Sequence, residues 1–234
     1  MITLGIDLSS SKDLTVACAI HWGKGQAVVR SPVLRCDDAE LDNLISKADV
    51  IGIDAPFGWP KAFTEAVADW TGTTWGRDER IRLQYRATDL LVQKETGIWP
   101  LSVSTDRIAL PAMRAMALLQ RHKVKNLSGD GRFYEVYPAA SLKRWGLPCR
   151  KYKNIDEPCG IARVDILKKL RLMLPWLEVP REYSATSDAL DSLIASLTAR
   201  TAAQGLSVPP KPLETSVARR EGWIHLPTAL PQLQ

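Results

Sequence analysis

The sequence has no long hydrophobic run and no paired cysteines, and each absence excludes a class of protein. No stretch of about 18 apolar residues is present to span a bilayer, and the N-terminus lacks a basic region followed by a signal-like apolar core. The four cysteines form no Cys-x-x-Cys pair and have no histidine spacing suited to zinc. We therefore expect a cytoplasmic protein with reduced structural thiols and no contact with a membrane.

A strong charge of either sign is also missing, since lysine and arginine together exceed aspartate and glutamate by only five. The pI of about 9.1 permits a polyanionic partner without requiring one. Hydrophobic residues make up 45% of the 234 residues and charged residues 24%, which is ordinary for a globular protein. We expect residues 1–234 to form one domain, with a helical insertion around residues 60–125 and a tail from about residue 205.

Two short apolar runs each end in an aspartate. Residues 1–8 include Asp7 and residues 50–60 include Asp54, and neither run alternates with polar residues, as is typical of strands covered on both faces. In an open α/β sheet, ligands collect outside the carboxyl ends of the strands. Two carboxylates at one edge repel each other, and a divalent cation relieves that repulsion. Taken alone, Asp7 is also explained as the start of a turn.

The segments between these aspartates predict how the two strands are arranged. Residues 14–22 and 27–35 read as strands with a short link, which indicates an antiparallel meander after the first strand. Residues 37–47 carry apolar residues at helical spacing behind two candidate N-cap aspartates. A strand, helix, strand passage of this length predicts a parallel crossover, so the strand ending at Asp54 should lie beside the first strand.

A third acidic candidate lies on a predicted strand over residues 132–138, where Glu135 shares a face with Phe133 and Tyr137. A carboxylate among aromatic side chains is costly to desolvate unless it is paired, protonated or bound to a cation. Glu135 is therefore a stronger candidate for a functional role than a surface glutamate, and a purely structural role is the alternative.

The last acidic candidates lie on a predicted helix over residues 184–203. One stripe of this helix is rich in leucine, and the opposite stripe consists of alanine and serine together with Asp188, with Asp191 on its flank. A helix with two such stripes is expected to be buried on both sides, which brings Asp188 inward. The alternative is that both aspartates simply favour the helix N-terminus through its dipole.

Two basic segments are candidates for contact with phosphate groups. A predicted helix over residues 78–95 carries Arg86, and a loop over residues 146–160, expected to be mobile, carries Lys151 and Lys153. A solvated surface is the alternative in both cases. We also expect helices at residues 106–122 and 161–174, and a short closing strand or tail at residues 219–225.

Six short pieces spread over nearly the whole chain give a resemblance to a known family. The sequence resembles domain of unknown function 429, a family described as predicted nucleases of the RNase H fold. The pieces are Gly5-Ile6-Asp7, Ile53-Asp54-Ala55-Pro56-Phe57-Gly58, Arg86-Ala87-Thr88-Asp89, Glu135-Val136-Tyr137-Pro138, Ser187-Asp188-Ala189-Leu190-Asp191 and Glu221-Gly222-Trp223-Ile224. The Arg86-x-Thr-Asp89 piece has no counterpart in ordinary RNase H enzymes.

The resemblance implies an α/β fold with an RNase H-like mixed five-stranded sheet in the order 3-2-1-4-5 and helices on both faces. It also implies a metal-dependent nuclease that hydrolyses DNA or RNA. Four carboxylates would hold one or two Mg²⁺ or Mn²⁺ ions, with Asp191 as a further ligand and Arg86, Lys151 and Lys153 as contacts to the nucleic acid. The four are Asp7, Asp54, Glu135 and Asp188.

Two other functions fit parts of the sequence. The segment from Gly5 to Ser11 also looks like the first phosphate loop of the actin-like and sugar kinase ATPases. Those proteins normally need two such domains and a second glycine-rich loop, whereas Ala-Pro-Phe-Gly follows Asp54 here. The third possibility is a catalytically silent module that binds nucleic acid or a protein partner.

Overall fold

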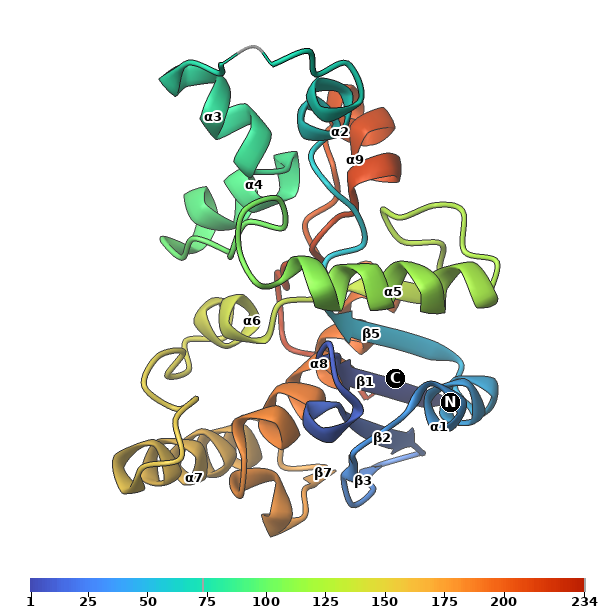
Figure 1. Cartoon of the computed structure of the whole chain (residues 1–234). Coiled ribbons are helices and arrows are strands. Elements are labelled where there is room, and N and C mark those ends of the chain that lie inside the picture. The colour runs from blue at the N-terminus through green and yellow to red at the C-terminus, as the bar shows by residue number, and fades with distance from the viewer. Residues whose placement is uncertain (73, 234) are drawn as a thin grey trace.

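The computed structural model describes residues 1–72 and 74–233, and they form a mixed α/β structure around one sheet (Figure 1). Seven strands are present in this part of the chain, in the order β6-β5-β1-β2-β3-β7, with β4 also paired to β2. The strands are β1 (Ile2–Asp7), β2 (Val16–Trp22), β3 (Ala27–Val29), β4 (Val33–Leu34), β5 (Val50–Asp54), β6 (Phe133–Glu135) and β7 (Leu177–Glu178).

The first half of the sheet follows the predicted topology. Strands β1, β2 and β3 form an antiparallel meander, and β5 returns parallel to β1 after the helix α1 (Asp38–Lys47). Asp37 caps this helix by accepting a hydrogen bond from the backbone N–H of Glu40 at 2.9 Å. The predicted strand over residues 27–35 is instead divided into β3 and β4, because Pro32 between them has no N–H to donate to a ladder. The sheet also has two more strands than the five expected.

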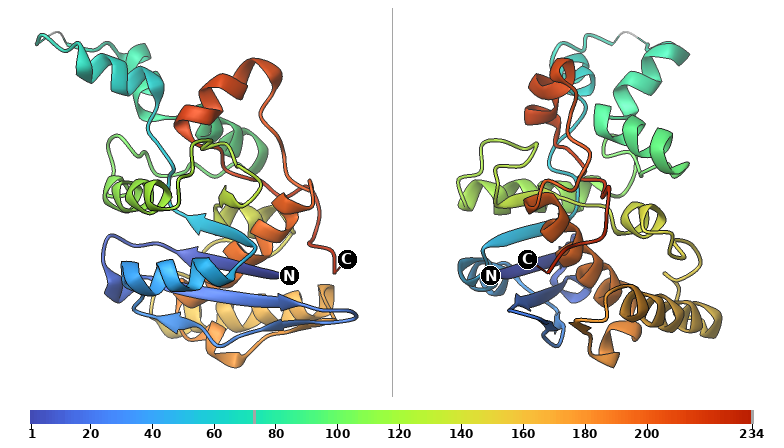
Figure 2. Two further views of the ribbon diagram at one scale, coloured as in Figure 1. Left: turned by 90° about the vertical axis from the view of Figure 1, so that its right-hand side faces the viewer. Right: turned by 180° about the vertical axis from the view of Figure 1, so that it is seen from behind.

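Helices cover both faces of the sheet (Figure 2). On one face, Leu4 and Ile6 of β1 pack with Ile45 of α1 and with Leu118 of α5 (Ala109–Arg121). On the other face, the core between β2 and the helices α7 (Glu157–Met173) and α8 (Ser187–Ala203) consists of aliphatic and aromatic side chains such as Ile20. The apolar runs of β1 and β5 are explained by this coverage, since neither face of these strands meets water.

The helix α8 lies directly against the backbone of the two central strands. A Cβ atom on Gly5 would clash with the carbonyl oxygen of Ser192, and one on Gly52 would clash with the carbonyl oxygen of Ala195. The two glycines are therefore required by the closeness of the helix rather than by backbone conformation. The leucine stripe and the small stripe of α8 are both buried, as predicted. The helix begins three residues later than expected, at Ser187, because Thr186 is its N-cap.

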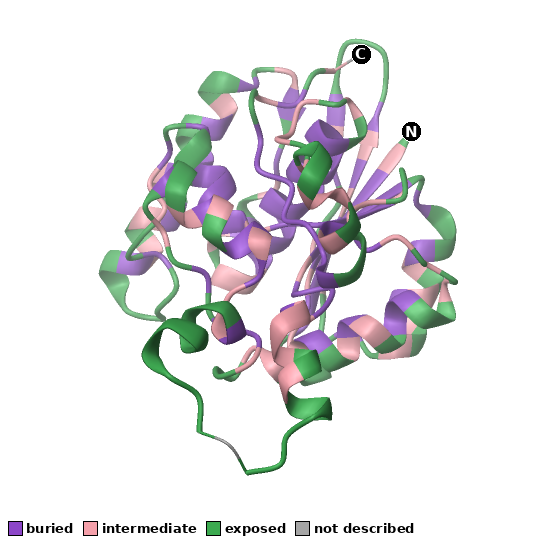
Figure 3. Cartoon of the chain, turned by 90° about the horizontal axis from the view of Figure 1, so that it is seen from above, coloured by how far each residue is buried: buried purple, intermediate pink, exposed green. Residues whose placement is uncertain are grey.

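Four α-helices lie between β5 and β6 in the residues described on either side of position 73: α2 (Lys61–Ala68), α3 (Arg77–Gln84), α4 (Ala87–Thr96) and α5. The single helix predicted over residues 78–95 is wrong, because the chain leaves helical conformation at Tyr85 and Arg86, between α3 and α4. Arg86 is 2% exposed and turns into the core, which a continuous surface helix would not permit. Much of α2 and α3 is exposed, as Figure 3 shows.

The remaining helices are α6 (Pro138–Arg144) and α9 (Thr215–Glu221), and α6 was not anticipated. The helix expected from residue 161 begins at Glu157 because Asp156 caps it. Residues 219–221 belong to α9 rather than to a closing strand, although Ile224 makes one parallel bridge with Glu135. Across the described residues, we find no helix that combines the length and the apolar character needed for crossing a membrane.

Candidate functional site

Asp7 and Asp54 are the last residues of two neighbouring parallel strands. They are paired in register between β1 and β5, so both carboxylates start from the same edge of the sheet. Glu135 ends β6, which pairs in parallel with β5, and it stands opposite Ile53. The prediction that the strands ending at Asp7 and Asp54 lie side by side and parallel is therefore confirmed, and Glu135 ends the next strand at the same edge.

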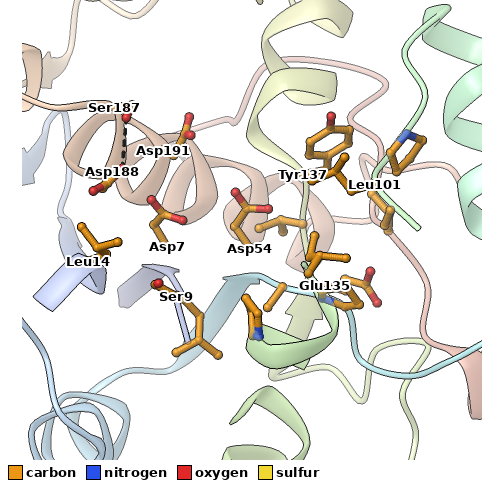
Figure 4. Close-up of a pocket in the computed structure, with 18 of the residues that line it drawn as sticks. Asp7, Ser9, Leu14, Asp54, Leu101, Glu135, Tyr137, Ser187, Asp188 and Asp191 are labelled. Carbon is orange, nitrogen blue, oxygen red and sulfur yellow. Dashed lines mark hydrogen bonds between the residues drawn. The ribbon is translucent and has the colours of Figure 1, made fainter. Parts of the chain in front are cut away.

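The helix α8 adds two carboxylates from its first turns. Asp188 and Asp191 follow the N-cap Thr186, and the close packing of α8 on β1 brings them over the strand ends. Asp7, Asp54, Asp188 and Asp191 all line one cavity of about 390 Å³. Figure 4 shows their carboxylates gathered around the start of α8, with Glu135 lying beyond Asp54.

The rest of the cavity wall is largely apolar. Leu14 and Leu101 line it and are both 59% exposed, so they form its outer rim. Tyr137 lies on the inner wall, where burial raises the pKa of its hydroxyl to about 12, helped by the charge of Asp54. Further apolar lining residues are Leu8, Pro100, Ile108, Pro111 and Ile224. The cavity therefore has an acidic floor and walls suited to a planar or apolar group.

Glu135 lines the same cavity, but its carboxylate is fully engaged elsewhere. Arg86 donates to both of its oxygens, at 2.7 Å to Oε1 and 2.9 Å to Oε2, and the backbone N–H of Phe57 also donates to Oε2 at 3.0 Å. Both side chains are 2% exposed. Of the three ways in which a buried carboxylate can be relieved of its desolvation cost, the structure shows pairing, with Arg86 as the partner of Glu135.

The Arg86-x-Thr-Asp89 piece is the centre of this buried network. Asp89 accepts hydrogen bonds from the Arg86 guanidinium and from the Arg86 backbone N–H at the start of α4. Thr88 Oγ1 accepts the backbone N–H of Ile224 at 2.7 Å. The piece therefore holds α4, β6 and the C-terminal segment together, and the Arg86 side chain is not free to contact nucleic acid. Sequence analysis missed this role because the partners are far apart in the chain.

Lys153 reaches the acidic floor of the cavity. Its Nζ lies 2.9 Å from Oδ2 of Asp191, whose Oδ1 accepts the hydroxyl of Tyr152 at 2.8 Å. Lys153 and Tyr152 belong to the loop expected to be mobile. Both side chains contact Asp191, and Tyr152 is fully buried, so this part of the loop is held against the cavity. Lys151, two residues earlier, is exposed and does not line the cavity.

Three of the aspartates that line the cavity, Asp7, Asp54 and Asp191, hold their protons more tightly than free aspartates do. Burial raises the pKa of Asp7 well above its ordinary value, and the charges of Asp54 and Asp191 raise it further. Burial also raises the pKa of Asp54 to about 7, although the Lys153 ammonium lowers it. Burial lowers the pKa of Lys153, but Asp191, Asp54 and Asp7 outweigh this and raise it. Burial and mutual repulsion therefore disfavour the ionised form of these carboxylates, and one ammonium does not offset both effects.

No three acidic, histidine or cysteine side chains among residues 1–72 and 74–233 stand close enough together to hold a metal ion as they are. Within the same residues, the side chains of Asp7 and Asp54 accept no hydrogen bond and form no ion pair with Nζ or guanidinium groups. The side chain of Asp188 accepts only the hydroxyl of Ser187, at 3.0 Å. These three carboxylates consequently have oxygen atoms available for a ligand that enters the cavity.

A comparison with protein families gives one match. The sequence model of the family described as "Protein of unknown function (DUF429)" matches residues 5–215, which include every acidic residue of the cavity. Searches of curated proteins and of solved structures find no match. Because the family match spans most of the chain, the protein belongs to the DUF429 family.

Proposed function

We propose that the protein is a metal-dependent nuclease that hydrolyses phosphodiester bonds of DNA or RNA in the acidic cavity. One observation carries the proposal: Asp7 and Asp54 end neighbouring parallel strands in register, and Asp188 lines the same cavity from α8. Oxygen ligands from carboxylates are those that Mg²⁺ and Mn²⁺ prefer in proteins. The consecutive strands β3-β2-β1-β5-β6 further support an RNase H-like fold.

Asp7, Asp54 and Asp188 would hold the ion, because they have oxygen atoms that no other group occupies. Glu135 is not retained as a ligand, since Arg86 engages both of its oxygens. The three aspartates must draw together on binding, since they do not form a ready-made site. A cation would offset the burial and the repulsion that together raise the pKa of Asp7. When bound, the ion activates a water molecule and stabilises charge on the phosphate.

Side chains that line the cavity would orient the reacting phosphodiester. In the hydrolysis, the oxygen of water forms a bond to phosphorus while the bond to the leaving oxygen breaks. The water loses a proton to solvent and the leaving oxygen gains one, so the reaction needs no further reactant. The Lys153 ammonium lies beside the acidic floor and can neutralise a phosphate oxygen. Apolar wall residues such as Leu101 and Tyr137 offer a surface for the adjoining base.

The proposal is tested by metal-dependent cleavage of a panel of single-stranded, duplex, hybrid and branched nucleic acids. We expect cleavage of at least one substrate in Mg²⁺ or Mn²⁺ and none in a chelator. The Asp54→Asn protein, prepared in parallel, shows whether a contaminating nuclease is responsible, because a contaminant would be equally active in both preparations.

The alternatives predict different results in the same experiments. Tight ATP binding without cleavage of any nucleic acid would favour a phosphotransferase. Nucleic-acid binding that survives asparagine or glutamine substitution of Asp7, Asp54, Glu135 and Asp188 would favour a silent module. Failure to bind any divalent ion at millimolar concentration would overturn the nuclease proposal.

Metal affinity is expected to rise with pH between about 5 and 7.5. A proton and a metal ion compete for the same carboxylate, and the pKa of Asp54 near 7 means that the proton must be displaced below that pH. We expect an increase of up to about tenfold per pH unit for each displaced proton. Isothermal titration with Mg²⁺ or Mn²⁺ at three pH values measures this. Equal affinity at pH 5.5 and 7.5 would contradict the raised pKa.

A further inference from the structure

We infer that the site binds a single divalent ion and that the Lys153 ammonium takes the place of a second one. The inference rests on the proposed function and specifies how the site stabilises the phosphate. It follows from the partners of the acidic residues and from the way in which the Lys153 loop is held.

Only some of the carboxylates that line the cavity have oxygen atoms left for a metal ion. Both oxygens of Asp191 are engaged, Oδ1 by the hydroxyl of Tyr152 at 2.8 Å and Oδ2 by Nζ of Lys153 at 2.9 Å. Both oxygens of Glu135 are engaged by Arg86. The carboxylates left are Asp7, Asp54 and Asp188. Three carboxylates and water satisfy one Mg²⁺ ion, whereas a pair of ions about 4 Å apart requires more shared ligands.

The backbone around Lys153 is held in position by hydrogen bonds from Arg163 and Ser187. Arg163 donates to the backbone carbonyls on both sides of it, at 2.7 Å to Tyr152 and 2.8 Å to Asn154. The carbonyl of Lys153 itself lies 3.2 Å from the hydroxyl of Ser187, which shares its one proton between this oxygen and Oδ1 of Asp188. A lysine at a flexible surface loop would lack these three anchors. These hydrogen bonds therefore hold the backbone of Lys153 in the position from which its ammonium reaches the cavity.

The Lys153 ammonium lies between the acidic floor and the solvent. Lys153 is the lysine that lines the cavity among the described residues, and its side chain is 54% exposed. The side chain thus borders both the acidic floor and the solvent from which a phosphodiester arrives. An ammonium there can stabilise negative charge on a phosphate oxygen during the displacement, which is the task of the second ion in two-ion nucleases.

The test is the number of Mn²⁺ ions bound per chain, measured by the electron paramagnetic resonance signal of free Mn²⁺ at known protein concentration. We expect one ion for the wild-type chain and two for Lys153→Met, because loss of the ammonium frees Asp191 and vacates the position of the second charge. Lys151→Met is the matched control, since Lys151 is exposed in the same loop and outside the cavity. It should bind one ion.

Cleavage is measured on the same proteins. Lys153→Met should cleave at least about 100-fold more slowly than wild type at a Mn²⁺ concentration that fills only the first site, whereas Lys153→Arg, which keeps the charge, should retain more activity. Thermal unfolding identifies a variant that has not folded, and Lys153→Gln then replaces Lys153→Met.

The possible stoichiometries separate this inference from the proposed function. Two ions in the wild-type chain, or one ion in both the wild-type and Lys153→Met chains, would overturn the inference and leave the nuclease proposal intact. A wild-type chain that binds no ion would overturn the nuclease proposal, and the inference with it.

Discussion

Replacing Arg86 by methionine is expected to lower the free energy of unfolding by about 3–5 kcal/mol, because it leaves two buried carboxylates without their counter-ion. Arg86 bonds to Asp89 and Glu135, whose side chains are 1% and 2% exposed, and it also donates to the backbone carbonyl of Glu221 at 3.0 Å. Urea unfolding at pH 7.5, followed by far-ultraviolet circular dichroism, measures the change.

Arg82→Met is the control for this experiment. Arg82 lies four residues earlier in the chain and is exposed on α3, so its loss should change stability by less than about 0.5 kcal/mol. Adding Glu135→Gln to Arg86→Met should recover part of the loss, since an amide is less costly to bury than an unpaired carboxylate. Equal stability of Arg86→Met and the wild-type protein would refute the buried network.

The Asp54→Asn protein is expected to lose at least about 10³-fold in cleavage rate and, at the same time, to gain stability at pH 8 in the absence of metal. The pKa of Asp54 is raised from 3.8 to about 7 in the folded protein. The folded state therefore binds this proton more tightly than the unfolded state does. Stability that is fully present below about pH 4 is lost as the pH rises to about 7.

Asparagine removes the charge and with it this loss. Since water in the open cavity screens part of the repulsion, we expect a gain of about 2 kcal/mol at pH 8, or about 4–8 °C in Tm, and almost none at pH 4. Asp69→Asn, at the exposed end of α2, is the control and should leave Tm unchanged. Mg²⁺ should raise the Tm of the wild-type protein and not that of Asp54→Asn. A lower Tm for Asp54→Asn at pH 8 would show that the carboxylate is favourably paired.

The local sequence predicts the part of the site that depends on regular structure. Asp7 and Asp54 follow apolar runs whose strand character is evident, and the helix between them fixes the parallel pairing. Asp188 and Asp191 follow from the two buried stripes of α8. A continuous apolar run carries the information for the two strands and a periodicity of about 3.6 residues carries it for the helix, and tertiary structure does not overrule either.

Other parts of the site depend on partners that no local pattern specifies. Residues 78–95 have helical composition, but the pairing of Arg86 with Glu135, 49 residues away, breaks the helix. The Lys153 loop has the composition of a solvated segment, yet the burial of Tyr152 and the two hydrogen bonds from Arg163 hold it against the site. Long-range ion pairs and anchored loops are decided by tertiary packing, so sequence patterns leave them open.

Gly5 and Gly52 let α8 contact the backbone of β1 and β5 directly. The spacing of the carboxylates in the acidic floor therefore does not depend on how the leucine side chains of α8 pack. At Gly5 and Gly52 the helix meets main-chain atoms, which have no rotamers and cannot repack. Exchanging leucine for isoleucine or methionine elsewhere in α8 should therefore alter stability while the spacing between the strand-borne and helix-borne aspartates stays constant. Drift of the aliphatic interior over evolutionary time would leave the spacing of the acidic floor untouched, whereas a single methyl group at Gly5 would lift the helix and separate its carboxylates from those of the strands.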